Sequence, residues 1–99
     1  MSGQPPVIVR HDEAASSFEA EIDGHLAHAD YVLDGTRMTF THTYVPPELR
    51  GRGIAEQLVR PALAYARERN LRVIPACSYV AAFIARHPEF TDLLAPPQV

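Results

Sequence analysis

A chain of 99 residues has room for one domain, and 46% hydrophobic with 21% charged residues is the composition of a folded globular protein. A formal net charge of −3 argues against a general nucleic-acid binder, and no apolar run is long enough to cross a bilayer. Residues 1–6 lack the basic and apolar stretches of a secretory signal, so we expect a flexible tail there. One cysteine cannot form an internal disulfide, which is typical of a cytoplasmic protein.

The first half of the chain has the pattern of antiparallel strands. Residues 7–10 are a short strand candidate, and alternating apolar and polar residues follow in three longer runs, at residues 17–22, 25–33 and 36–45. An Asp-Gly pair separates each of these three runs from the next, and such pairs favour tight type I′ turns. The sequence therefore predicts a three-stranded antiparallel meander.

A helix is expected from about Ile54 to Arg69, with Asn70 as its stop and a kink at Pro61. Its apolar stripe consists of Ala55, Leu58, Val59, Ala62 and Ala66. A strand over residues 71–77 follows at once. A strand, a helix and a strand in succession predict a right-handed crossover between two parallel strands.

A second, short helix is expected from Tyr79 to about Arg86, with Ser78 as its cap. Val80, Phe83 and Ile84 are expected to face the core. Residues 90–94 read as a last short strand or turn, and residues 95–99 as a loose C-terminal tail. The predicted architecture is a single α+β domain over residues 7–94.

The glycine-containing turn between the third strand of the meander and the long helix is the most informative stretch. It runs through Arg50, Gly51, Arg52, Gly53, Ile54 and Ala55. Amides at a helix N-terminus lack intrahelical acceptors and favour anions, and glycine lets a ligand approach the backbone closely. A dinucleotide fingerprint is excluded because Glu56 stands at its third glycine position, and a P-loop because the chain has no lysine. The turn predicts a site for another phosphate-bearing ligand.

The pattern Arg50-x-x-Gly53-x-Ala55 resembles the pyrophosphate-binding motif of the GNAT superfamily of acyl-CoA N-acyltransferases. Further segments resemble one small single-domain subfamily of it: His42-Thr43, Val45-Pro46, Leu49 to Gly53, Val73-Ile74-Pro75, Cys77 and His87-Pro88-Glu89. The resemblance extends over roughly residues 7–94. It implies a GNAT-like fold in which the two parallel strands splay apart near Val45 and Cys77. It also implies that acetyl-CoA or coenzyme A binds with its diphosphate on the amides of residues 50–55 and its pantetheine arm beside Tyr44 and Val45.

Cys77 and His42 are the candidate catalytic residues. Cys77 directly precedes a helix N-terminus, which stabilises a thiolate, and could accept the acyl group; a buried structural cysteine is the alternative. We expect His42 to share a face with Phe40 and Tyr44, where it would act as general base, orient Cys77 or only hydrogen-bond within the sheet. Glutamate is common in the subfamily where this chain has Tyr44, and a phenol is the poorer base at neutral pH.

Three functions remain open on these observations. The first is an acetyl-CoA-dependent N-acetyltransferase acting on an unidentified amine of a small molecule or protein, by direct attack or through an acyl-Cys77 intermediate. The second is a non-catalytic module that binds coenzyme A or acyl-CoA, a reading that Tyr44 favours. The third is an anion-responsive interaction domain that uses the region from Arg50 to Arg60. The other histidines lack metal-ligand spacing, so no metal site is expected.

Overall fold

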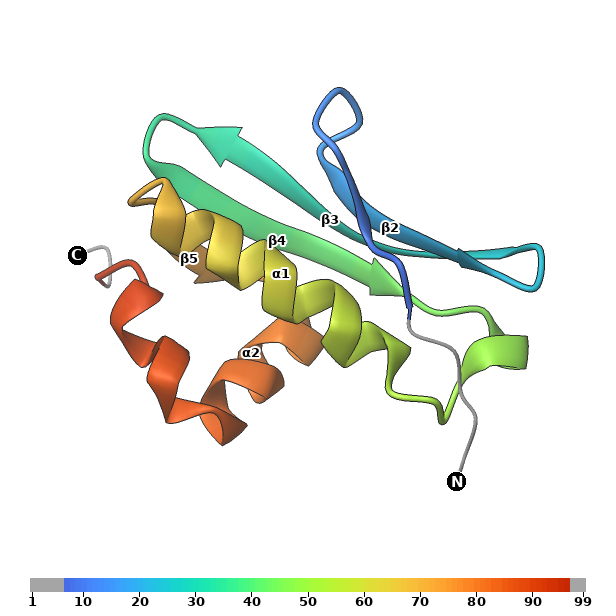
Figure 1. Cartoon of the computed structure of the whole chain (residues 1–99). Coiled ribbons are helices and arrows are strands. Elements are labelled where there is room, and N and C mark those ends of the chain that lie inside the picture. Colours follow the sequence, from blue (N-terminus) through green and yellow to red (C-terminus); the bar gives the residue numbers. More distant parts are fainter. Residues whose placement is uncertain (1–6, 97–99) are drawn as a thin grey trace.

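The computed structural model describes residues 7–96 as a single mixed sheet with helices packed on it (Figure 1). The strand order is β1-β2-β3-β4-β5, and all neighbours are antiparallel except β4 and β5, which run parallel. The strands are Arg10–Asp12 (β1), Ser17–Ile22 (β2), His25–Asp34 (β3), Arg37–Tyr44 (β4) and Arg72–Pro75 (β5). The predicted meander leading into a parallel pair is thus confirmed. The expected tail at residues 1–6 lies outside the described residues, as do residues 97–99 of the expected C-terminal tail.

Strand β1 begins later than its sequence candidate at residues 7–10. Val7 and Val9 pack against the core beside the sheet and do not pair within it. The strand ends at Asp12, whose carboxylate accepts a hydrogen bond from the amide of Ala15 at 3.1 Å and so closes the turn into β2. Apolar residues that pack without pairing carry the same sequence signal as a strand, which explains the shift.

The two hairpin turns differ in their chemistry. Asp23 and Gly24 both have positive φ (53° and 79°), as a type I′ turn requires. The second turn centres on Gly35 and Thr36, because Asp34 still pairs with Arg37 in the ladder. The expectation that Asp34 and Gly35 form its centre is therefore wrong by one residue. Gly35 at φ 62° is the position that requires glycine, and this matches a type II′ turn.

The helices are α1 (Ile54–Glu68) and α2 (Ser78–Arg86), with short 3₁₀ segments η1 (Pro47–Leu49) and η2 (Pro88–Leu93). Helix α1 runs through Pro61 as one element and ends before Asn70, which has φ 56° as expected for a helix stop. The N-cap of α2 is Cys77, and not Ser78 as the sequence suggested. The last segment is a 3₁₀ helix, with a single parallel bridge from Leu94 to Val73 in place of a full strand.

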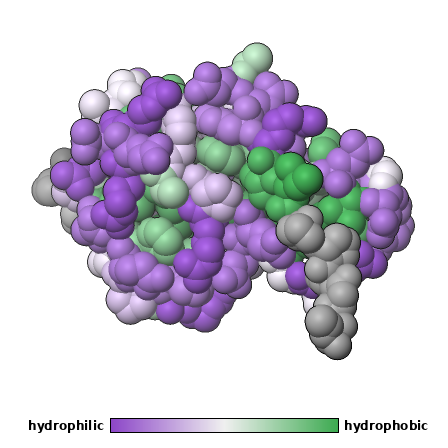
Figure 2. All heavy atoms as spheres, viewed as in Figure 1, coloured by the Kyte–Doolittle hydropathy of each residue, from purple (hydrophilic) through white to green (hydrophobic). Residues whose placement is uncertain are grey.

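Both α-helices pack against the same face of the sheet (Figure 1). Phe40 from β4, Val59 from α1 and Phe83 from α2 belong to one buried cluster. On the opposite face no described helix covers the strands, so Leu26 and Val32 are 44% and 54% exposed there. The molecule is a two-layer structure with one open sheet face. Figure 2 shows the helix-covered face, which is largely hydrophilic because the apolar sides of the helices are turned inward.

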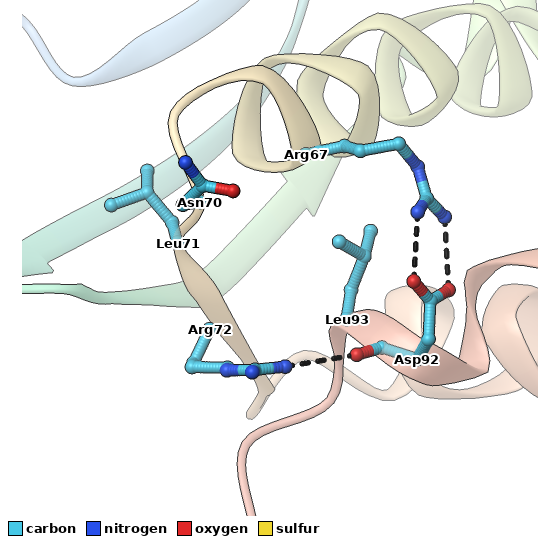
Figure 3. A pocket seen from close by; sticks show the side chains of 6 residues that line it. All are labelled: Arg67, Asn70, Leu71, Arg72, Asp92 and Leu93. Carbon is cyan, nitrogen blue, oxygen red and sulfur yellow. Dashed lines mark hydrogen bonds and ion pairs between the residues drawn. The ribbon is translucent and has the colours of Figure 1, made fainter.

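The segment η2 is tied to α1 and β5 by arginine contacts (Figure 3). Arg67 holds both carboxylate oxygens of Asp92 at 2.7 and 2.9 Å, and Arg72 donates to the Asp92 carbonyl at 3.1 Å. The hydrogen bond from Arg67 holds the pKa of Asp92 below its usual range. The three residues line a pocket of about 200 Å³ together with Asn70, Leu71 and Leu93. This pocket lies at the C-terminal end of α1, away from the glycine turn, and its charged groups bind one another, so we assign it a structural role.

The one-sided core predicts an asymmetric response to truncation of the sheet side chains. Replacing the fully buried Phe40 (Phe40→Ala) is expected to lower the free energy of unfolding by about 3–5 kcal/mol, because it removes buried apolar area and leaves a cavity. Val32→Ala on the open face is the matched control, with an expected loss below about 1 kcal/mol. Urea denaturation of the two variants measures the difference. Equal losses would contradict the assignment of the faces.

Candidate functional site

Strands β4 and β5 part before β4 ends. Their parallel register runs from Arg37 opposite Arg72 to Phe40 opposite Pro75. One more backbone hydrogen bond follows, from the amide of Cys77 to the carbonyl of Phe40 at 2.8 Å, and the chain then turns into α2. Beyond this point residues 42–44 of β4 pair only with β3 among the described strands. The side of β4 that faced β5 is left without a strand partner there.

A bulge at Thr41 reverses the orientation of the last part of β4. Tyr31 pairs with Phe40, and the preceding residue of β3 pairs with His42, so Thr41 is the extra residue. Phe40 is buried on the helix side, whereas His42 is exposed. The expectation that His42 shares a face with Phe40 is therefore wrong. An extra residue shifts the two-residue alternation of a strand by one and so exchanges its faces.

Thr43, and not His42, is the β4 residue that contacts the cysteine. The Sγ atom of Cys77 and the Oγ1 atom of Thr43 are 3.5 Å apart. His42 lies on the other face, where its ring is 6.0 Å from the ring of His28 and 6.5 Å from that of Tyr44 (centroid distances). The sequence placed His42 and Tyr44 together correctly, but it did not identify Thr43. Thr43 faces Cys77 only because of the bulge, and the alternation of residues in the sequence does not reveal a bulge.

Cys77 is half-buried at the N-cap of α2. Burial raises the pKa of its thiol, but hydrogen bonds from the Thr43 hydroxyl and the backbone amides of Val80 and Tyr79 outweigh burial, so the pKa lies below its usual value. The two amides belong to the first turn of α2, whose dipole also favours a negative charge. The environment therefore favours the thiolate, the nucleophilic form of cysteine.

The turn before α1 presents a run of backbone amides with no acceptor. Within the described residues, no hydrogen bond is donated by the amides of residues 51–56. Gly51 and Gly53 have φ values of 84° and 72°, and Gly53 is the N-cap of α1. A Cβ atom at either glycine would meet nothing within 4 Å, so the space over the turn is open. Free amides, a helix N-terminus and open space are what a diphosphate group requires.

The side chains of the arginines near this turn already have partners within the protein. The Arg50 side chain donates to the Val45 carbonyl at 3.0 Å and so closes the loop from β4. Arg52 lies 3.5 Å from the carboxylate of Asp23 in the β2–β3 turn. Arg60 pairs with Glu56 at 3.1 Å, with its guanidinium 5.3 Å from the centre of the Phe83 ring. The free backbone amides are therefore better placed than the arginine side chains to donate hydrogen bonds to an anion.

The structure brings most of the sequence-derived site residues to the end of β4 and the loop that follows it. Tyr44 and Val45 lead into the loop, and Ile54 and Ala55 begin α1. Cys77 reaches the same segment from β5 through its contact with Thr43. Within residues 7–96 no group of three or more potential metal ligands comes together. No helix among these residues is long and apolar enough to span a membrane.

These features agree with comparisons to known proteins. The family model for GCN5-related N-acetyltransferases matches residues 17–93. Protein NATD1 of Bos taurus is 34% identical over 92% of this chain and 85% of its own length, and NATD1 of Mus musculus is 32% identical over 92% and 87%. The solution structure of a GCN5-like protein from Staphylococcus aureus superposes with a TM-score of 0.73 at 26% identity, covering 92% of this chain and 90% of that one. The chain belongs to the GCN5-related N-acetyltransferase family.

The contact between Thr43 and Cys77 makes a prediction about thiol reactivity. Thr43→Val removes a hydroxyl that stabilises the thiolate, so the pKa of Cys77 should rise and its alkylation by iodoacetamide at pH 7 should slow. The midpoint of the rate against pH should move to higher pH. Thr41→Val, on the exposed bulge of the same strand, is the control and should react as the unmodified protein does. An unchanged rate in Thr43→Val would contradict the assigned cause.

Proposed function

We propose that the protein transfers the acetyl group of acetyl-CoA to an amine. The observation that carries this proposal is the combination of an unpaired end of β4 with an open run of free amides in the same connection to α1, after η1. The amides of residues 51–56 fit the diphosphate of coenzyme A, with Arg52, Ile54 and Ala55 contributing backbone and not side-chain contacts. The amide of Arg50 donates to the Pro47 carbonyl at 3.3 Å, so Arg50 would border the site without an amide contact. Tyr44 and Val45 then border the pantetheine arm along the unpaired edge of β4. The single cysteine, which cannot form an internal disulfide, and the use of acetyl-CoA are both consistent with a cytoplasmic protein.

The direction of β4 determines where the thioester would lie. A diphosphate on the amides before α1 leaves the pantetheine to extend back along β4, toward the point where β5 parts from it. That point is marked by the hydrogen bond from Cys77 to Phe40 and by the contact between Cys77 and Thr43. The acetyl carbonyl would therefore lie near a thiol whose pKa is lowered by its hydrogen bonds to Thr43 and the first turn of α2. We propose that Cys77 accepts the acetyl group and passes it to the amine.

One observation favours a second function, a module that binds coenzyme A without catalysis. Tyr44 supplies no carboxylate at the position where the resembling subfamily commonly has glutamate, and a phenol is a poor base at neutral pH. Such a module would bind the diphosphate at the same site but would not transfer the acetyl group. The two functions differ in whether labelled acetyl groups pass from acetyl-CoA to amines. Detectable turnover in that assay would exclude the non-catalytic module.

Substitution of Gly53 tests the diphosphate site. Gly53→Ala should weaken coenzyme A binding by about tenfold in calorimetry, because alanine at φ 72° is strained by about 1–2 kcal/mol and shifts the turn toward other conformations. Gly35→Ala is the matched control: its φ of 62° produces similar strain in the β3–β4 turn, far from the site, and its affinity should be unchanged. Equal affinities in both variants would argue against the turn as the binding site.

Intact-protein mass spectrometry with acetyl-CoA tests the route through Cys77. We expect one acetyl increment on the protein, its absence in Cys77→Ala, and ping-pong kinetics for the unmodified enzyme. Cys77→Ala should lose most of the transfer rate while it retains coenzyme A binding. Full activity in Cys77→Ala would exclude the relay and leave direct attack within a ternary complex. Absence of both binding and modification would exclude the proposed function as a whole.

A further inference from the structure

A cluster of side chains on the open sheet face includes, besides Tyr44, three residues that have no part in the function described so far. It comprises His28 and Asp30 of β3 with His42 and Tyr44 of β4. The ladder places His28 opposite Tyr44 and Asp30 opposite His42. The ring of His28 has its centroid 5.7 Å from that of Tyr44 and 6.0 Å from that of His42. The cluster therefore forms one continuous patch across the two strands.

The imidazole of His28 is held in a defined orientation. Its Nδ1 atom lies 2.9 Å from Oδ1 of Asp30, and the same oxygen accepts a hydrogen bond from the Ser17 hydroxyl, also at 2.9 Å. Ser17 is a buried polar residue, at 4% exposure, so the carboxylate is anchored from the neighbouring strand. A carboxylate bound to Nδ1 selects the tautomer whose Nε2 atom carries the free lone pair. This is the arrangement of a base oriented by a third group.

The other acidic residue beside His28 is already occupied. Glu19 of β2 lies directly opposite His28 in the ladder, but its carboxylate binds Arg10 at 2.6 Å. The remaining histidine of β3, His25, has only a loose contact with Glu48, at 3.7 Å. Its side chain and that of Glu48 are 39% and 59% exposed, against 27% and 34% for His28 and Asp30. The pair of His28 and Asp30 is thus the shorter and the less hydrated.

The position of the cluster relates it to the proposed acetyl site. His42 and Tyr44 belong to the segment of β4 that has no partner on the β5 side. Thr43, between them in sequence, points to the helix-covered face and contacts Cys77. One short segment therefore presents the thiol side on one face and the histidine cluster on the other. Because no β5 pairing closes the sheet here, the two faces adjoin at the free edge of β4.

We propose that His28, oriented by Asp30, is the general base that deprotonates the acceptor amine, which approaches from the open sheet face beside Tyr44. This inference rests on the proposed acetyl transfer. An alkyl amine arrives as an ammonium ion, and an electron-rich aromatic ring next to a carboxylate suits a cation. His28 would also supply the basic group that Tyr44 does not provide, at a position where the resembling subfamily commonly has a carboxylate.

The steps balance in protons and electrons. The Nε2 lone pair of His28 takes one proton from the ammonium group, which leaves a neutral amine and an imidazolium. The amine lone pair forms the new C–N bond at the thioester carbonyl carbon, the C–S bond breaks, and its electron pair leaves on sulfur. The second proton of the nitrogen neutralises the thiolate. His28 then releases its proton to solvent.

Two acceptor amines distinguish a base from a structural residue. Phenethylamine is protonated at pH 7 and needs a base, whereas aniline is already neutral there. His28→Gln retains a donor for Asp30 and should lower kcat with phenethylamine by about 100-fold while aniline changes by less than about threefold. Asp30→Asn should act in the same direction with a smaller loss. His25→Gln on the same strand is the matched control and should leave both rates unchanged.

Chemical rescue supplies a second readout. Added imidazole should restore the phenethylamine rate of His28→Ala and leave the unmodified enzyme unaffected, and thermal melting should show that the variants are folded. Equal loss with both amines, or no loss with either, would overturn the role of His28 while the acetyl transfer stands. If the unmodified protein acetylates neither amine and does not bind coenzyme A in calorimetry, the proposed function fails, and the inference fails with it.

Discussion

Strand β4 has hydrogen-bonded neighbours on both sides only as far as Phe40, and the rest of the site depends on this limit. An unpaired strand edge inside a protein needs another hydrogen-bonding partner or water, because buried backbone polar groups are costly when left alone. Here the edge is followed, after the short 3₁₀ segment η1, by a turn whose amides at residues 51–56 also lack acceptors among the described residues. Under the proposed function, these two backbone stretches hold one elongated donor, with its diphosphate at Gly53 and its thioester near Phe40.

Much of the fold could be predicted because its signals are local. The bounds of β2 and the first residue of α1 agree with the sequence pattern, since alternation, Asp-Gly turns and helix periodicity are properties of short windows. The free amides also followed from local chemistry, because glycines before a helix leave its first turn open. The stripe on α1 was incomplete: Leu63 is fully buried, and Ala55, which was included, is only partly so.

The site was harder to predict from the sequence, because the bulge at Thr41 is a property of two paired strands and not of one segment. Thr41 reads as one more alternating β-branched residue, and only the partner register reveals that it is extra. That single residue decides that Thr43 faces Cys77 and that His42 does not. In the same way, the sequence did not separate Cys77 from Ser78 as the N-cap, because serine is a common N-cap residue, whereas α2 already includes Ser78 as its first residue.

The open sheet face follows from the size of the chain. A domain of 99 residues buries a smaller share of its surface than a larger one, and here the apolar residues suffice for one layer of helices. An uncovered face must then carry polar or half-exposed side chains, as β3 does with His28 and Asp30. On this open face the unpaired part of β4 presents the exposed side chains of His42 and Tyr44. A donor held along the edge and an acceptor approaching from the open face would therefore reach the same carbonyl without a lid or a second domain.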